Sequence, residues 1–241
     1  MQAVVLAGGL GTRLWPLTKE IPKPMAPVNG VPYLEYQLRL LAAQGFGSVL
    51  VLTGYLGEQI ESYFQDGSAL GLALRYSREP APQGTGGALR HAGALLEDRF
   101  VLIYGDSFLP IDYRLLFPQL DEPGTEGLVV VYDNRVEDTS VRNNIALDDK
   151  NRVTAYSKDS DEWTRLSYVE AGVLAFRRSI LELIPSGVVS LEKEIFPVLI
   201  QSRALAGYPT RQRFYDIGTP ERLARFEAYL KHDYHANAFS H

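Results

Sequence analysis

Short runs of apolar residues alternate, along the first half of the chain, with stretches whose apolar residues recur at helical spacing. Residues 3–7 and 48–53 are rich in valine and leucine and show no polar alternation, which is typical of strands buried on both faces of a parallel sheet. Between them, residues 33–45 repeat leucine every three or four positions and predict a helix with one apolar face. Strand, helix and strand in succession predict a parallel sheet with right-handed crossovers.

The second half of the chain continues this alternation with shorter strands and more polar connections. The further strands that we predict are residues 72–77, 100–104, 128–132, 145–147, 153–156 and 172–176. The further helices are residues around 58–64, 86–96, 178–184 and 190–202, and one that begins at Pro220. The sequence predicts one α/β domain over residues 1–241, with a Rossmann-like, mostly parallel sheet flanked by helices and a smaller mixed-sheet half. Residues 231–241 show no period and predict a frayed tail.

Composition and charge exclude several classes of protein. The 241 residues include 24 Lys+Arg and 29 Asp+Glu, a net charge of −5, which argues against a protein that coats nucleic acid. The absence of cysteine excludes disulfides, thiolate metal sites and a cysteine nucleophile. No run approaches the roughly 18 apolar residues of a membrane span, and the N-terminus lacks the basic segment of a signal peptide. We therefore predict a cytoplasmic protein with neither nucleic acid nor a membrane as partner.

Three glycines follow the first predicted strand. Gly8, Gly9 and Gly11 allow backbone N–H groups to approach phosphate oxygens closely, because no Cβ atom is in the way. The chain has no Gly-Lys pair and so no Walker A loop. A dinucleotide fingerprint would need a glycine in place of Leu14 and an unbroken helix where Pro16 stands, which argues against a nicotinamide-dependent oxidoreductase. On the glycines alone, an ordinary tight turn is an equal alternative.

Two cations stand in the loop after these glycines. Arg13 follows them directly, and Lys23 is held between Pro22 and Pro24, whose rings restrict the backbone. A fixed ammonium and a forked guanidinium suit a triphosphate whose α-phosphorus is attacked. The alternative is an exposed basic loop with no ligand.

The whole stretch from residue 8 to residue 24 carries a family resemblance. It reads Gly-Gly-x-Gly-Thr-Arg-Leu-x-Pro-Leu-Thr-x-x-x-Pro-Lys-Pro, which resembles the signature of the sugar-1-phosphate nucleotidylyltransferases. The resemblance covers almost the whole chain and implies that an NTP and a sugar 1-phosphate are joined to give an NDP-sugar and pyrophosphate. It also implies the nucleotide-diphospho-sugar transferase fold, with a nucleotide-binding half over residues 1–110 and a sugar-phosphate-binding half over residues 111–230.

The same resemblance assigns roles to individual residues. It implies that Arg13 and Lys23 are catalytic, because they would hold the triphosphate and stabilise the transition state. The nucleotide-binding residues that it implies are Leu6, Ala7, Gly8, Gly9, Gly11, Thr12, Arg13, Lys23, Glu79, Gly84, Thr85 and Asp106.

Two aspartates far apart in the sequence are the candidate metal ligands. Asp106 follows the strand predicted over residues 100–104, and Asp216 precedes the last helix. Alone, each is more often a turn or N-cap residue. A divalent cation that bridges triphosphate oxygens needs one or two carboxylates, and the resemblance implies that these two aspartates hold Mg²⁺.

Glu79 is the candidate for reading the nucleotide base. A carboxylate only accepts hydrogen bonds, and guanine offers two adjacent donors, its ring N–H and its amine, so Glu79 favours GTP. The alternative is that Glu79 begins a turn before Pro80. Residues 23–28, 64–68 and 84–89 are most similar to the D-glycero-D-manno-heptose 1-phosphate guanylyltransferases, which implies heptose 1-phosphate as the favoured acceptor. We keep a homodimer as the candidate assembly.

The sugar side departs from the family pattern at three positions. Lys158 is the candidate ligand of the sugar phosphate, but Ser157 stands where relatives have a glutamate. Asn144 replaces a glycine near the sugar. Glu170 replaces an amide or a small residue, and is either an acceptor of two sugar hydroxyls or an exposed residue at a strand end.

The chemistry implied by the resemblance needs positive charge more than a base. A phosphate monoester is largely dianionic near neutrality, so its oxygen can attack the α-phosphorus in line without a general base. Arg13, Lys23, Lys158 and Mg²⁺ would supply the charge. Two alternatives remain: a cytidylyl-, uridylyl- or thymidylyltransferase with another phosphorylated acceptor, and a non-catalytic module that binds nucleotide sugars.

Overall fold

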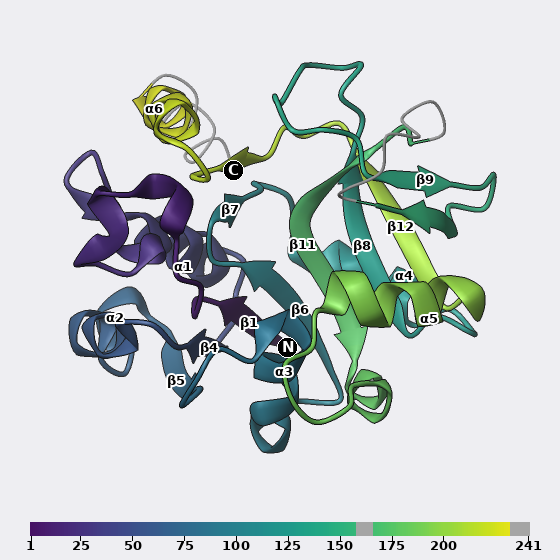
Figure 1. Cartoon of the computed structure of the whole chain (residues 1–241), viewed down its shortest axis with the longest axis horizontal. Coiled ribbons are helices and arrows are strands. Elements are labelled where there is room, and N and C mark those ends of the chain that lie inside the picture. Colours follow the sequence, from purple (N-terminus) through teal and green to yellow (C-terminus); the bar gives the residue numbers. More distant parts are fainter. Residues whose placement is uncertain (158–165, 232–241) are drawn as a thin grey trace.

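A seven-stranded sheet forms the centre of the molecule in the computed structural model, which describes residues 1–157 and 166–231 (Figure 1). Its strand order is β12-β8-β11-β6-β1-β4-β5. The strands are β1 (Gln2–Leu6), β4 (Ser48–Thr53), β5 (Ala73–Arg78), β6 (Arg99–Tyr104), β8 (Gly127–Tyr132), β11 (Val169–Arg177) and β12 (Leu205–Thr210). β11 runs antiparallel to β6 and β8, and the other neighbours are parallel. The predicted α/β fold with a mostly parallel sheet is confirmed.

Helices cover both faces of the sheet. They are α1 (Tyr33–Ala43), α2 (Gly57–Phe64), α3 (Gly84–His91), α4 (Leu116–Leu120), α5 (Phe196–Gln201) and α6 (Pro220–Tyr229). Apolar residues of α1, α2 and α4 pack on one face, and those of α3 and α5 pack on the other. Adjacent residues such as Val4 and Val5 therefore belong to opposite core layers, and both are fully buried. This two-sided burial explains why the strands contain continuous apolar runs.

Short strand pairs lie outside the main sheet. They are β2 (Pro27–Val28) with β3 (Val31–Pro32), β9 (Ile145–Leu147) with β10 (Val153–Tyr156), and β7 (Ser107–Phe108) with β13 (Tyr215–Asp216). A third apolar cluster joins α6 to β2, β7 and the start of α1, with the Phe226 ring at its centre. This cluster fixes the end of the described chain beside the first helix.

Three predicted helices differ from the observed ones. The stretch 86–96 is α3 followed by a 3-10 turn at Gly93–Leu95, and 178–184 is a 3-10 helix at Arg178–Leu183. The stretch 190–202 begins as a wide π turn at Leu191–Ile195 before α5. Pro197, near the start of α5, has no N–H to donate to the preceding turn, so one uninterrupted α-helix cannot form there.

The sheet passes without a break from the first half of the chain to the second. β5, β4, β1 and β6 come from residues before 110, and β11, β8 and β12 come from residues after it. The division near residue 110 remains a prediction. Among the described residues, no helix combines the length and the apolar character needed to cross a bilayer.

Candidate functional site

The glycine-rich loop leaves the carboxyl end of β1 and is packed too tightly for larger residues. A Cβ atom at Gly8 would lie 2.9 Å from Glu79 Oε1, and one at Gly11 would lie 2.8 Å from Lys23 Cβ. Gly11 also has a positive φ of 64°, which disfavours any residue with a side chain. Gly8 and Gly11 are therefore needed to bring this loop against Glu79 on one side and Lys23 on the other, whereas a Cβ atom at Gly9 would meet nothing within 4 Å.

Lys23 forms an ion pair with Asp106. Lys23 begins the 3-10 turn Lys23–Met25 between its two prolines, and the residue is only 8% exposed. Its Nζ atom donates to Asp106 Oδ2 over 2.5 Å. Burial alone would raise the pKa of Asp106, but the charges of Lys23 and Arg13 outweigh burial and hold that pKa below its usual value. The carboxylate therefore stays ionised, as a metal ligand must.

A glutamine from α1 holds the turn that carries Asp106. Gln37 is 3% exposed, and its Nε2 atom donates to the carbonyl oxygens of Tyr104 (2.9 Å) and Ser107 (2.5 Å), on either side of the aspartate. Sequence reasoning missed this residue. The available signal is its position: Gln37 is a polar residue three positions after Leu34, on the buried face of the helix.

The β7–β13 pair brings the second aspartate to the same place. Asp216 pairs with Ser107 in this ladder, and the N–H of Ile217 donates to the carbonyl of Asp106 over 3.0 Å. Asp216 Oδ1 accepts hydrogen bonds from the Gly218 N–H (2.7 Å) and from Arg222 Nη1 (3.2 Å). Two carboxylates separated by more than a hundred residues are thus brought together, Asp216 in β13 and Asp106 directly before β7.

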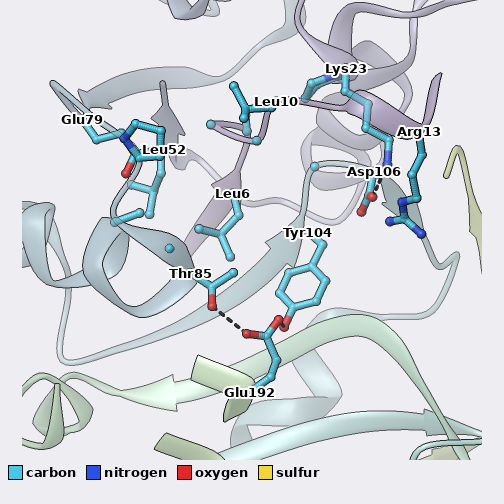
Figure 2. Close-up of a pocket in the computed structure, with 18 residues that line it drawn as sticks. Leu6, Leu10, Arg13, Lys23, Leu52, Glu79, Thr85, Tyr104, Asp106 and Glu192 are labelled. Atoms are coloured by element: carbon cyan, nitrogen blue, oxygen red, sulfur yellow. Dashed lines mark hydrogen bonds and ion pairs between the residues drawn. The ribbon is translucent and has the colours of Figure 1, made fainter. Parts of the chain in front are cut away.

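Two adjoining cavities open beside these carboxylates. The first has a volume of about 390 Å³ and the second about 280 Å³. Arg13, Tyr104 and Asp106 line both, so the cavities share a wall. Figure 2 shows the first cavity, with Arg13, Lys23 and Asp106 at one end and Glu79 at the other.

Most of the residues singled out in the sequence line one of the two cavities. The first is lined by Leu6, Ala7, Gly8, Gly9, Arg13, Lys23, Glu79, Gly84, Thr85 and Asp106. The second is lined by Arg13, Asp106, Asn144, Glu170 and Asp216. Gly11 and Thr12 line neither: Gly11 precedes the 3-10 turn Thr12–Leu14 that carries Arg13. Lys158 lies outside the described residues. The functional roles of all of these residues remain predictions.

Glu79 is fixed by the backbone around it. Its N–H donates to the carbonyl of Thr53 (3.0 Å), and its Oε2 atom accepts from the N–H of Gln83 (3.0 Å). Burial raises the pKa of Glu79, and the Gln83 hydrogen bond and the nearby His91 oppose that shift. The side chain is thus a partly buried carboxylate in the cavity wall, whatever part it plays in a turn.

Two buried glutamates lie near the Tyr104 hydroxyl. Glu192 accepts from the hydroxyls of Tyr104 (2.9 Å) and Thr85 (2.7 Å) and lines the first cavity (Figure 2). Glu170 accepts from the Tyr156 hydroxyl (2.9 Å) and lines the second. Burial and both carboxylates raise the pKa of Tyr104 well above its usual value, so its hydroxyl stays protonated.

Of these two glutamates, only Glu170 was singled out as a candidate site residue in the sequence. Glu170 is 8% exposed, and its N–H donates to Asn144 Oδ1 (2.9 Å), so the alternative of an exposed strand-end residue is wrong. Glu192 was missed, because one glutamate in a stretch with three charged residues at 192–194 gives no signal of burial.

The carboxylates fit a small divalent cation. Among the described residues no group of three His, Cys, Asp or Glu side chains is arranged to hold a metal ion by itself. Asp106 and Asp216 nevertheless line one cavity, and each carboxylate already faces a cationic side chain. Two carboxylates suit Mg²⁺, which usually completes its octahedron with phosphate oxygens and water.

The chain is similar to known proteins in its sequence and in its fold. The chain is 37% identical over 235 residues to the mannose-1-phosphate guanylyltransferase of Mycobacterium tuberculosis, covering 95% of this chain and 64% of that protein. It is 30% identical over 248 residues to the D-glycero-alpha-D-manno-heptose 1-phosphate guanylyltransferase of Aneurinibacillus thermoaerophilus, covering 96% and 99%. The crystal structure of HddC from Yersinia pseudotuberculosis superposes with a TM-score of 0.81 at 24% identity, covering 95% and 99%, and shares the fold.

A family model for nucleotidyl transferases matches residues 2–232, nearly the whole chain. The chain belongs to the nucleotidyl transferase family.

Proposed function

We propose that this chain is a sugar-1-phosphate nucleotidylyltransferase, which joins an NTP to a sugar 1-phosphate and releases pyrophosphate. The observation that carries the proposal is the shared wall of the two cavities, where Arg13 and Asp106 line both. Such a wall lets two phosphorylated ligands meet at one charged point. Two relatives of the chain are named as guanylyltransferases of sugar 1-phosphates, which supports the same reaction class.

In this reaction the chain's own residues supply charge and position. An oxygen of the sugar phosphate attacks the α-phosphorus in line, a new P–O bond forms, and the bond to the bridging oxygen of the β-phosphate breaks to release pyrophosphate. Lys23 and Arg13 face the triphosphate and stabilise the negative charge that develops on it. Asp106 and Asp216 would hold Mg²⁺, which neutralises phosphate oxygens when bound.

GTP is the nucleotide that the first cavity favours. Glu79 lies at the end of this cavity away from Asp106 (Figure 2), where a base would lie if the triphosphate is held at Lys23. One Glu79 oxygen already accepts the Gln83 N–H. A carboxylate has about four acceptor sites, so capacity remains for the two donors on the edge of guanine.

The second cavity is the proposed sugar site. Asn144 and Glu170 line it. The Glu170 N–H donates to Asn144 Oδ1 and fixes that amide, and the Tyr156 hydroxyl donates to the Glu170 carboxylate. A buried carboxylate is suited to accept hydrogen bonds from sugar hydroxyls, and heptose 1-phosphate is the acceptor we favour. We assign Lys158 to the acceptor phosphate on the family resemblance alone.

Pyrophosphate release tests the proposal. The purified chain is incubated with Mg²⁺, each of the four common NTPs plus dTTP, and a panel of sugar 1-phosphates that includes heptose, mannose and glucose. We expect release with GTP and at least one acceptor. Turnover with CTP, UTP or dTTP but not GTP would overturn the base assignment and favour the other transferases. No release with any pair, while nucleotide sugars still bind, would favour a non-catalytic module.

A further inference from the structure

We propose that Arg222 binds the phosphate of the acceptor, as an additional cation on the sugar side of the reaction. This inference rests on the proposed function, because it assumes that the second cavity takes a sugar 1-phosphate. Arg222 lies in the first turn of α6 and lines the second cavity but not the first. Lys23 lines the first cavity but not the second, and Arg13 lines both. The cations are therefore divided between the two ligands, with one shared.

The guanidinium of Arg222 is held in place before any ligand arrives. Nη1 pairs with Asp216 Oδ1 at 3.2 Å, and Nη2 donates to the carbonyl of Ser140 over 2.6 Å. The side chain is 22% exposed, so it is partly shielded from solvent. These contacts use two of the five N–H donors of a guanidinium, and the others are available for phosphate oxygens. A fork fixed in this way loses little conformational entropy when it binds.

Three charged groups lie close to the backbone at Gly218, beside the second cavity. A Cβ atom at Gly218 would lie 2.6 Å from Asp216 Oδ1, 3.4 Å from Arg222 Nη1 and 3.8 Å from Arg13 Nη1. Arg222 thus lies close to both Asp216 and Arg13. A phosphate that reaches the proposed metal ligand from the second cavity would meet both guanidinium groups.

The charges that line the second cavity explain why the positive charge of Arg222 is needed there. The described residues that line this cavity include three carboxylates (Asp106, Glu170 and Asp216) and three guanidinium groups (Arg13, Arg142 and Arg222). Without Arg222, and before Mg²⁺ binds to the two aspartates, this described lining would carry a net negative charge. A sugar 1-phosphate is close to a dianion at neutral pH and would be repelled.

The test compares substitutions at two arginines of the same helix. Arg222→Gln removes the charge, Arg222→Lys keeps it without the fork, and Arg225→Gln is the matched control. Arg225 also contacts Ser140, through Nη1 and the serine Oγ at 2.8 Å, but lines neither of the two cavities. The KM values for GTP, for Mg²⁺ and for the acceptor are measured with mannose 1-phosphate, or with the panel member that the unaltered chain uses fastest.

For Arg222→Gln we expect the KM of the acceptor to rise roughly ten- to hundred-fold, the range expected for loss of a charged hydrogen bond. The KM of GTP should change less than about twofold, Arg222→Lys should recover part of the loss, and Arg225→Gln should match the unaltered chain. A misfolded variant would lose kcat without this selective change in KM.

Two results would overturn the inference. An unchanged acceptor KM would show that Arg222 does not bind the acceptor. Arg222 would instead act through Asp216 if only the half-saturating Mg²⁺ concentration rose. The same conclusion would follow if the KM values of GTP and of the acceptor rose equally. Failure of the unaltered chain to release pyrophosphate with any pair would instead reject the proposed function, so the two failures are distinguishable.

Discussion

Replacing Gln37 with methionine should weaken both the fold and the reaction. The carboxamide of Gln37 donates to the carbonyls of Tyr104 and Ser107, which flank Asp106. Methionine has a similar volume, so the packing of α1 is kept while both donors are lost. The change therefore isolates the hydrogen bonds that fix the turn of Asp106, the proposed metal ligand.

The size of the effect follows from the groups left unpaired. Two buried carbonyls lose the Gln37 donor, at a cost of about 1–3 kcal/mol for each acceptor left without a partner. Methionine also removes Gln37 Oε1, a buried oxygen without a hydrogen-bond partner among the described residues, and this offsets about one of the two losses. We expect Gln37→Met to lower the free energy of unfolding by about 1–3 kcal/mol.

Urea unfolding measures the stability, and pyrophosphate release at saturating GTP measures the effect on catalysis. A turn that no longer holds Asp106 in place should raise the half-saturating Mg²⁺ concentration and lower kcat in folded protein. Gln37→Glu tests the same hydrogen bonds more specifically, because a carboxylate facing two carbonyls cannot donate a hydrogen bond unless it is protonated. Burial and these acceptors raise the pKa of such a carboxyl group, so the variant should gain stability as the pH falls from 7 towards 5.

Three results together would refute this reasoning. They are an unfolding free energy within about 0.5 kcal/mol of the unaltered chain, an unchanged Mg²⁺ dependence, and a Gln37→Glu variant whose stability does not depend on pH in this range. In that case Gln37 would be an ordinary buried residue, and the turn at Asp106 would be fixed by the β7–β13 ladder alone.

The remaining predictions concern two other residues of the site and Tyr33 of the third apolar cluster. Lys23→Met should lower kcat by about 10²–10³-fold. It should also raise the pKa of Asp106, because the positive charge that opposes the effect of burial is lost; carbon-13 NMR of the carboxyl group would show the shift. Glu79→Gln should reduce the preference for GTP over the other NTPs by about tenfold in kcat/KM, and an unchanged ratio would reject Glu79 as the base reader. Tyr33→Phe should stabilise the fold by about 0.5–2 kcal/mol in thermal or urea unfolding, because the buried Tyr33 hydroxyl has no partner among the described residues; a loss would reveal a hidden one.

The parts of the fold that follow from hydrophobic pattern were predictable from the sequence. The predicted strand over residues 48–53 is β4 as observed. The helix predicted over 33–45 is α1, which ends at Ala43, two residues before Gly45, whose φ of 78° suits glycine. β12 was not predicted, because Gly207 and Pro209 disfavour a strand. It forms at the edge of the sheet beside β8, where the missing N–H of Pro209 disrupts less of the hydrogen-bonded ladder.

The site was predictable where a local motif or the family resemblance points to a residue. The glycines, Arg13 and Lys23 occupy consecutive parts of one signature. Gln37, Glu192 and Arg222 lie in three different helical segments. Tertiary contacts alone bring Glu192 and Arg222 to the cavities and Gln37 to the turn that carries Asp106. The two-residue ladder that joins Asp106 to Asp216 is likewise too short to show any pattern in sequence.

The ion pairs of the site explain how an acidic protein could accept two polyanions. Lys23 pairs with Asp106 and Arg222 pairs with Asp216, so each proposed metal ligand is already matched with a cation from another element. On the proposed function, phosphate oxygens would become further partners of these cations, and Asp106 and Asp216 would hold Mg²⁺, whose charge would then balance theirs. Neither Asp106 nor Asp216 then has to exist without a counter-charge at any stage, which avoids the cost of several kcal/mol for an unpaired buried ion. If this exchange operates, removing either cation should weaken substrate binding more than it destabilises the Mg²⁺-bound fold, because the aspartate left behind can still bind the metal.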